Sequence, residues 1–235
     1  MNKQMKAVLT FSLFDIRQPL TIFWSVLIGF MLLGTGISFT LGQGTIMIFS
    51  SSVAVYIFCG ISGFLTVRDT FPYNLKMGGT RRNYFVGISL YFLLLAIVMS
   101  AFHNVMITIF DKLVDVLKIN GIQFFHFSTL TGLQDTWILR FFIDGVLALF
   151  VLIFFFFLGV MFFRFGLIGG YSVIAICAIA IILPQGRDRL IEFFIGFATN
   201  DAILQYIWLL GIGVVLLFIT RLIMRKAPVG SAIVK

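Results

Sequence analysis

Uninterrupted apolar runs alternate with short polar segments along the whole chain. The runs recur at a length of roughly 20 residues, which is what a helix needs to cross the hydrocarbon core of a bilayer. The alternation of apolar and polar residues that marks a membrane β-barrel is missing. The pattern therefore predicts an all-α polytopic membrane protein. Its six transmembrane spans are expected at about 20–41, 45–67, 84–110, 138–163, 167–183 and 202–224.

Three further segments flank or connect these spans. Residues 1–18 carry an apolar stripe beside several cations, which is typical of an amphipathic helix in the membrane interface; a loose basic tail is the alternative. Residues 111–137 mix charges with apolar residues, so this external segment is expected to fold over the outer mouth. Residues 187–200 are too short to cross and are expected to form a re-entrant or interfacial helix on the outer side. We treat 1–235 as a single transmembrane domain.

Composition and charge agree with a membrane location. The chain is 60% hydrophobic and 11% charged, whereas a soluble domain has about 25% charged residues. The net charge of +8 could suggest nucleic acid, but the cations lie beside apolar spans, so no nucleic-acid partner is expected. With both termini cytoplasmic, the inner cations are Lys3, Lys6, Arg17, Arg68, Lys76, Arg81, Arg82, Arg164, Arg221, Arg225, Lys226 and Lys235. Only Lys112, Lys118, Arg140, Arg187 and Arg189 remain outside, which fits the positive-inside rule for a multi-pass protein of the cell membrane.

Residues 68–83 form the only long polar and basic segment between two apolar runs. Asp69 or Thr70 is expected to cap a new helix, with Pro72 in its first turn, where the missing N–H costs nothing. Gly78-Gly79 then supplies a left-handed stop, and a threonine cap opens the next span. The segment predicts a short cytoplasmic helix of about two turns that ends in a glycine hinge.

No catalytic motif stands out in the sequence. It has neither a P-loop, nor a zinc-protease motif, nor a nucleophile elbow. Cys59 and Cys177 fall in apolar runs and give no disulfide framework or metal spacing. His103 and Asn104 have no local carboxylate neighbour, so hydrogen bonding between helices is preferred to a metal site or a proton relay. We expect no enzyme activity and no cofactor in this chain.

One pair of opposite charges lies near the outer end of the fourth span. Arg140 and Asp144 are spaced i, i+4 and can therefore meet along one helical face. We expect a structural ion pair at the outer interface, because pairing makes burial of both charges tolerable. A gate or a contact with substrate is the alternative.

The polar segment also resembles a known family. Its run FPYNLKMGGTRRNYFVG, from Phe71 to Gly87, is similar to the first cytoplasmic loop of permease subunits of small Gram-positive type-2 ABC exporters. Such loops look like F-P-aromatic-x-L-x-M-G-x-S/T-R-K/R. The plan of an N-terminal helix, six spans and a short helix before the last span agrees as well. The large external domain of some type-2 exporters is absent from this sequence.

The resemblance implies a division of labour between subunits. Residues 70–78 would form a coupling helix gripped by a separate cytoplasmic ABC ATPase, which holds the ATP and magnesium. Two permeases, as a homo- or heterodimer in the membrane lipid, would form the pathway for an amphipathic or antimicrobial peptide, a lipid or a drug. The residues implied at the ATPase contact are Phe71, Pro72, Tyr73, Leu75, Lys76, Gly78, Gly79, Arg81 and Arg82. Lipid phosphates or plain topological anchoring would explain the cations among them equally well.

The same composition also fits two other classes of membrane protein. A substrate-binding subunit of a vitamin importer is also a small, basic, six-span protein, and tight binding of a vitamin by the isolated protein would favour it. An accessory or immunity membrane protein is a further alternative. An intramembrane enzyme would need paired acids, histidine clusters or a nucleophile dyad within the spans, and none is visible in the sequence.

Overall fold

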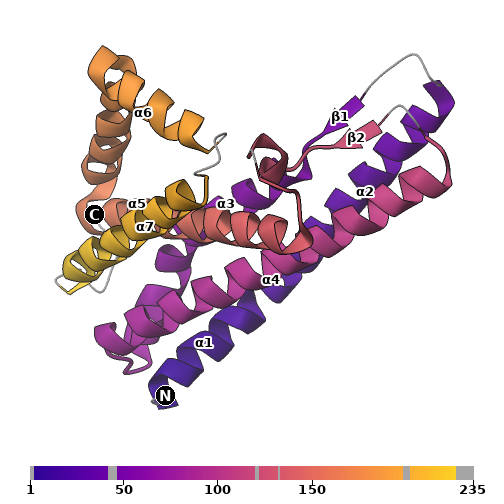
Figure 1. Ribbon diagram of the computed structural model, residues 1–235. Coiled ribbons are helices and arrows are strands. Elements are labelled where there is room, and N and C mark those ends of the chain that lie inside the picture. Colours follow the sequence, from indigo (N-terminus) through magenta and orange to yellow (C-terminus); the bar gives the residue numbers. More distant parts are fainter. Residues whose placement is uncertain (1–2, 42–46, 120–121, 132, 198–201, 226–235) are drawn as a thin grey trace.

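The computed structural model describes residues 3–41, 47–119, 122–131, 133–197 and 202–225 (Figure 1). Most of these residues are helical. Five helical stretches are long and apolar enough to cross a membrane, which is compatible with the predicted helical membrane protein. They cover Lys3–Thr40, Ser51–Lys76, Arg81–Val116, Trp137–Ile182 and Ala202–Met224.

The N-terminal helix and the first long helix follow each other almost without a break. Helix α1 covers Lys3–Asp15 and α2 covers Arg17–Leu41. The backbone N–H of Ile16 still donates to the carbonyl of Ser12, so the two helices appear as one long rod beside α4 (Figure 1). Part of the apolar stripe predicted for α1 packs against α4, since Val8 is buried next to Gly87.

The centre of the molecule is a close pair of helices, α3 (Ser51–Lys76) and the first part of α5 (Trp137–Ile182). A Cβ atom added at Gly63 would lie 2.5 Å from the carbonyl oxygen of Leu152, and one at Gly159 would lie 2.6 Å from that of Phe64. The two backbones therefore touch, as small residues allow between membrane helices. Helix α4 (Arg81–Val116) packs across both.

Helix α5 contains the two spans expected at 138–163 and 167–183. They form two limbs of one long helix with a kink at Gly166, whose φ of 68° and ψ of −157° lie outside the helical region. The kink lies within residues 164–166, between the two predicted spans, and glycine explains it, because other residues rarely adopt a positive φ. From Tyr171 onward the second limb is almost entirely exposed.

Helix α6 (Pro184–Gly196) follows the second limb and contains no buried residue. It begins three residues earlier than the short outer helix expected at 187–200, because Pro184 suits a first helical turn; residues 198–200 lie outside the described residues. Helix α7 (Ala202–Met224) then returns and packs on α5 (Figure 1).

Two short strands depart from the all-α expectation. Strand β1 (Met47–Phe49) pairs in parallel with β2 (Ile122–Phe124), with Met47 opposite Ile122. A 3₁₀ turn, η2 (Phe127–Leu130), follows and packs against α5. The segment predicted to fold over one end of the bundle does pack on the helices there, although α4 continues through the first part of it to Val116.

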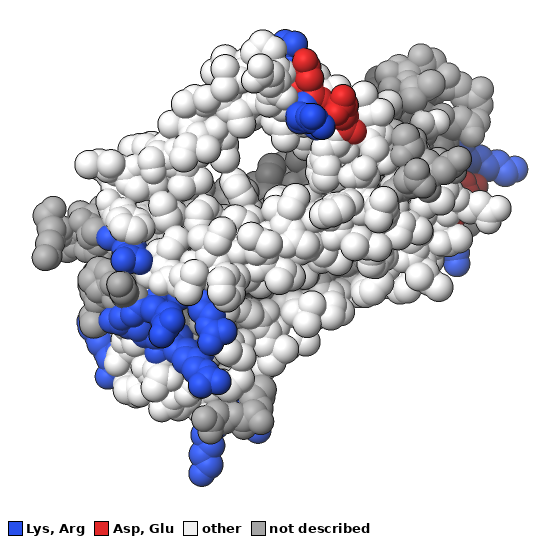
Figure 2. Space-filling model, turned by 60° about the vertical axis from the view of Figure 1, so that its left-hand side comes forward, with Lys and Arg blue, Asp and Glu red and all other residues white. Residues whose placement is uncertain are grey.

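Charge is distributed unevenly along the bundle. Figure 2 shows lysines and arginines gathered at one end of the molecule. The contacts place the start of α1, the end of α3, the start of α4 and the end of α7 at a common end: Gln4 bonds Gly78 and Asn83, and Arg81 bonds the carbonyl of Arg225. This end carries the segment singled out in the sequence.

Candidate functional site

The polar segment 68–83 begins as a direct continuation of α3. The hydroxyl of Thr70 donates to the carbonyl of Thr66 at 2.7 Å, which is a mid-helix contact and not a cap. Pro72 lies inside the helix. The separate two-turn helix predicted here is therefore the last part of α3, because neither Asp69 nor Thr70 interrupts the helical backbone.

The predicted stop and restart after this segment are both present. Gly78 has a φ of 79°, and the N–H of Gly79 donates to the carbonyl of Asn74 at 2.9 Å, which closes the end of α3. The hydroxyl of Thr80 accepts from the N–H of Asn83 at 3.3 Å and caps α4. The turn is thus fixed at both sides by local hydrogen bonds.

Phe71 is not on the surface of this segment. Its side chain is fully buried, and its ring contacts those of Tyr84 on α4 and Phe163 on α5, with centroids 5.2 Å and 5.5 Å apart. Leu75 is also partly buried. Phe71 cannot contact another protein in this conformation; it joins the end of α3 to two neighbouring helices instead.

The surface of the segment is formed by other predicted residues. Tyr73 is 45% exposed, and its ring stacks on that of Phe11 of α1 with the centroids 4.9 Å apart. Lys76 and Arg82 are exposed and have no hydrogen-bond or ion-pair partner among the described residues. Arg81 donates to the backbone carbonyl of Arg225. The segment therefore presents one aromatic ring and unpaired positive charge.

A buried polar network connects α3, α4 and α5 nearer their other ends. The carboxylate of Asp144 accepts from the hydroxyl of Tyr56 at 2.7 Å and from the amide of Asn104 at 3.3 Å. Nδ1 of His103 lies 2.8 Å from the same carboxylate, and its Nε2 lies 2.9 Å from the hydroxyl of Ser51. Three helices thus share one set of hydrogen bonds.

The order serine, histidine, carboxylate is that of a serine-hydrolase relay. Ser51 is only 1% exposed, however, so no substrate carbonyl can reach its hydroxyl in this conformation. In an apolar environment each of these groups would be costly to leave unpaired. The geometry therefore supports interhelical hydrogen bonding, which is the role preferred for His103 and Asn104 from the sequence.

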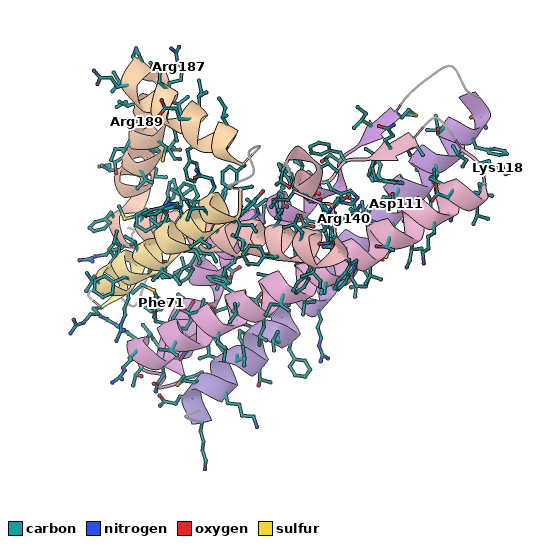
Figure 3. The ribbon with its side chains drawn as sticks, viewed as in Figure 1. Phe71, Asp111, Lys118, Arg140, Arg187 and Arg189 are labelled. Carbon is teal, nitrogen blue, oxygen red and sulfur yellow. The ribbon has the colours of Figure 1, made fainter. Side chains whose placement is uncertain are left out.

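The ion pair predicted between Arg140 and Asp144 does not form. Arg140 instead donates to both carboxylate oxygens of Asp135 and lies 3.7 Å from Asp111 (Figure 3). Hydrogen bonding from Arg140, followed by that from Ser128, holds the pKa of Asp135 below its ordinary value. The spacing argument failed because Asp144 faces α3 and α4, where it finds donors that lie far away in the sequence.

Ser51 and Tyr56 were missed by the sequence reasoning, and so was the link between His103 and Asp144. The histidine and its carboxylate are 41 residues apart on different helices, so a search for local neighbours could not pair them. The available signal was general: a titratable residue inside an apolar span needs a polar partner. No family model, curated protein or solved structure matches this chain.

Proposed function

We propose that the chain is the permease subunit of an ATP-driven exporter in the cell membrane. Its six spans would be α2, α3, α4, the two limbs of α5, and α7, with both termini cytoplasmic. The contacts support this order for α3, α4 and the first limb of α5. Successive contacts of Tyr56 with Asp144 and of Phe71 with Phe163 make α3 and the first limb of α5 parallel. The pairs Phe92–Phe156 and His103–Asp144 make α4 antiparallel to that limb.

The proposal rests mainly on the structure of the C-terminal end of α3. Tyr73 and Lys76 stand exposed on a helix that is closed by Gly78 and backed by the buried ring of Phe71. A rigid projection with an aromatic side chain and unpaired cations suits a cleft on an acidic partner protein. The partner would be an ABC ATPase that holds the ATP and magnesium.

Phe71 connects the proposed ATPase contact to the interior of the helix bundle. Its ring packs on Phe163, which lies three residues before the kink at Gly166. Force applied to the end of α3 would therefore reach the point at which the two limbs of α5 join. The exposed apolar second limb and α7 are available to lipid or to a second permease, and the pathway for an amphipathic substrate would form between two such subunits.

Co-purification of the partner tests the proposal. The protein would be extracted from its native membranes as wild type and as Tyr73→Ala/Lys76→Ala, and any bound ATPase would be measured by ATP hydrolysis and mass spectrometry. The matched control is Tyr171→Ala/Lys112→Ala, which removes an exposed tyrosine and an exposed lysine elsewhere. We expect the first variant to lose at least about tenfold of the ATPase, since interface aromatics often contribute more than 1.4 kcal/mol.

Phe71 is left unchanged in this experiment because its removal would disturb the core. If the Tyr73→Ala/Lys76→Ala protein still binds the ATPase, the end of α3 is not the ATPase contact. If the wild type binds no ATPase at all, the exporter proposal fails. Screening the isolated protein for tight vitamin binding would then test the importer alternative.

A further inference from the structure

A hollow of about 710 Å³ lies where the first limb of α5 and helix α7 end beside each other. We call it the arginine hollow, because Arg164 of α5 and Arg225 of α7 line it together with Leu222 and Ile223. Nη1 of Arg164 donates to the carbonyl oxygen of Ile223 at 2.7 Å and so joins the two helix ends. Arg225 is exposed and Arg164 is partly exposed, so a ligand can reach both guanidinium groups.

The positive charge of the arginine hollow is not neutralised by the residues that the structure describes. Neither Arg164 nor Arg225 has an ion-pair partner among them. Arg81 of α4 donates to the backbone carbonyl of Arg225, which brings a third guanidinium group close to the hollow. Figure 2 shows no acidic residue among the lysines and arginines gathered at this end of the bundle. Like charges repel one another, so an anion between them would stabilise the arrangement.

The chemistry of the guanidinium group indicates which anion fits. Its planar fork donates two parallel hydrogen bonds to a phosphate group. The fork of Arg164 is held in place by its bond to Ile223 and by the ring of Phe165, whose centroid lies 4.7 Å from Cζ of Arg164. Basic pockets between membrane helices on the cytoplasmic side bind the phosphates of lipid headgroups.

The surface next to the arginine hollow suits the acyl chain of a lipid. Phe218, Leu222 and Arg225 are spaced i, i+4, i+7, so they share one face of α7, and all three are exposed. Helix α7 (Ala202–Met224) is about 34 Å long, close to the roughly 30 Å hydrocarbon core, so Arg225 lies at the level of the headgroups. The two apolar side chains lie deeper, in the order in which an acyl chain follows a phosphate.

We propose that the arginine hollow binds an anionic phospholipid, with its phosphate between Arg164 and Arg225 and an acyl chain along Leu222 and Phe218. A headgroup with net negative charge is required, because the gathered guanidinium groups would repel the ammonium of a zwitterionic lipid. Arg164 lies two residues before the kink at Gly166, so the bound lipid would fasten the end of α7 to the bend of α5. The site lies apart from the end of α3 and does not rest on the exporter proposal.

Native mass spectrometry of the purified protein in neutral detergent tests the site. The probes are phosphatidylglycerol, phosphatidylcholine with the same chains, and inorganic phosphate as a competitor. The variant is Arg225→Gln, which keeps the backbone carbonyl that binds Arg81 and removes a side chain without a hydrogen-bond partner among the described residues. We expect phosphatidylglycerol to bind the wild type best and to bind the variant at least about tenfold more weakly, since charge-assisted hydrogen bonds are lost.

Lys6→Gln is the matched control, because Lys6 is an exposed cation at the same end of the bundle and has no ion-pair partner among the described residues. It should bind phosphatidylglycerol as the wild type does. An equal loss in both variants would overturn the proposal, because binding would then depend on the charge of the whole end. Phosphatidylcholine that binds as tightly as phosphatidylglycerol would also overturn it, and so would displacement of the lipid by an equal concentration of inorganic phosphate. No ATPase takes part in this measurement, so either proposal can fail alone.

Discussion

A carboxylate enclosed by apolar helices is stable only if donors surround it, and Asp144 has three. Tyr56, His103 and Asn104 reach it from two other helices, and it is 5% exposed. Such an arrangement fixes how these helices are rotated, because a turn of any one of them would leave polar groups unpaired in a medium without water. Asp144 is therefore the residue on which the arrangement of α3, α4 and α5 depends most.

Replacing Asp144 should be strongly destabilising. Asp144→Ala leaves His103, Tyr56 and Asn104 without their common acceptor, and each buried donor left unsatisfied costs about 1–3 kcal/mol. We expect a clear loss of thermal stability in detergent, measured by the fraction of protein that stays monodisperse on heating. The control is Asp188→Ala, where a side chain that is 62% exposed pairs with Arg187 alone among the described residues, and the change should stay below about 0.5 kcal/mol. Equal melting of the two variants would contradict the prediction.

Asp135 predicts a dependence of stability on acid pH. Arg140 lowers its pKa in the folded protein, so its contribution is complete above the pKa of the unfolded chain and is lost as the pH falls through the lower, folded value. The difference in unfolding free energy between wild type and Asp135→Asn should be constant above about pH 5 and shrink below about pH 4. Chemical unfolding over this range measures it. A difference that does not change with pH would show that Arg140 does not act on Asp135 in solution.

At the scale of elements, the backbones of α3 and α5 approach each other closely. Glycines on both helices make this approach possible. Gly63 and Gly159 each face a backbone carbonyl of the other helix, so neither position has room for a methyl group without separation of the helices. The phenylalanines between them then pack at short range, as Phe64 and Phe162 do with centroids 5.7 Å apart.

Gly63→Ala should therefore lower stability although alanine is the better helix former. Forcing a methyl group into this contact is expected to cost about 1–3 kcal/mol, more than the 0.5–1 kcal/mol that alanine contributes to a helix. Gly29→Ala is the matched control, since nothing lies within 4 Å of a Cβ at Gly29. We expect the control to melt at or above the wild-type temperature and Gly63→Ala below it. If both variants gain stability, the helices do not touch at this point.

The elements themselves were largely readable from the sequence. Apolar runs of membrane length gave the helices, and the glycine stop at Gly78 and the cap at Thr80 appear where they were expected, because both depend on local backbone chemistry. The continuity of α3 through Pro72 was not predicted, since a proline and a nearby capping residue usually mark a helix start. Here the burial of Phe71 against α4 and α5 favours continuation, and such tertiary contacts leave no local signature.

The candidate site was predicted less well than the helices, for a related reason. Tyr73 and Lys76 are exposed as a docking role requires, whereas Phe71 is internal, because a sequence pattern shows that a residue is apolar and not which way it faces. The predicted pairing of Arg140 with Asp144 was wrong, because i, i+4 spacing considers only contacts within one helix.

At the scale of the whole molecule, the arrangement of helix ends predicts the orientation in the membrane. The exposed cations at the end of α3 should face the cytoplasm, and Lys118 and Arg187 should face outward (Figure 3). Single cysteines at Lys76 and Lys118 can be tested with a membrane-impermeant maleimide on intact and on opened cells, in a Cys177→Ala background, because Cys177 is exposed.

We expect Lys118→Cys to react in intact cells and Lys76→Cys only after the cells are opened. The background protein, in which Cys59 remains buried, should not react in either case. The opposite pattern would show that the topology is inverted. The end of α3 would then face outward, where a cytoplasmic ATPase could not bind it. Labelling of both positions from outside would mean that α4, which connects them, does not cross.

The continuity of α3 has a mechanical consequence. Its close contact with α5 at Gly63 lies near the middle of the helix, about 18 Å from Ser51 and about 20 Å from Lys76 at 1.5 Å per residue. Other contacts with α5 lie toward both ends of α3, at Tyr56 with Asp144 and at Phe71 with Phe163, so α3 and the first limb of α5 are held together along their length. Displacement of Lys76 by a partner would move these two helices as one body against α4, and so strain the contact of Asp144 with His103 at the far end of the bundle.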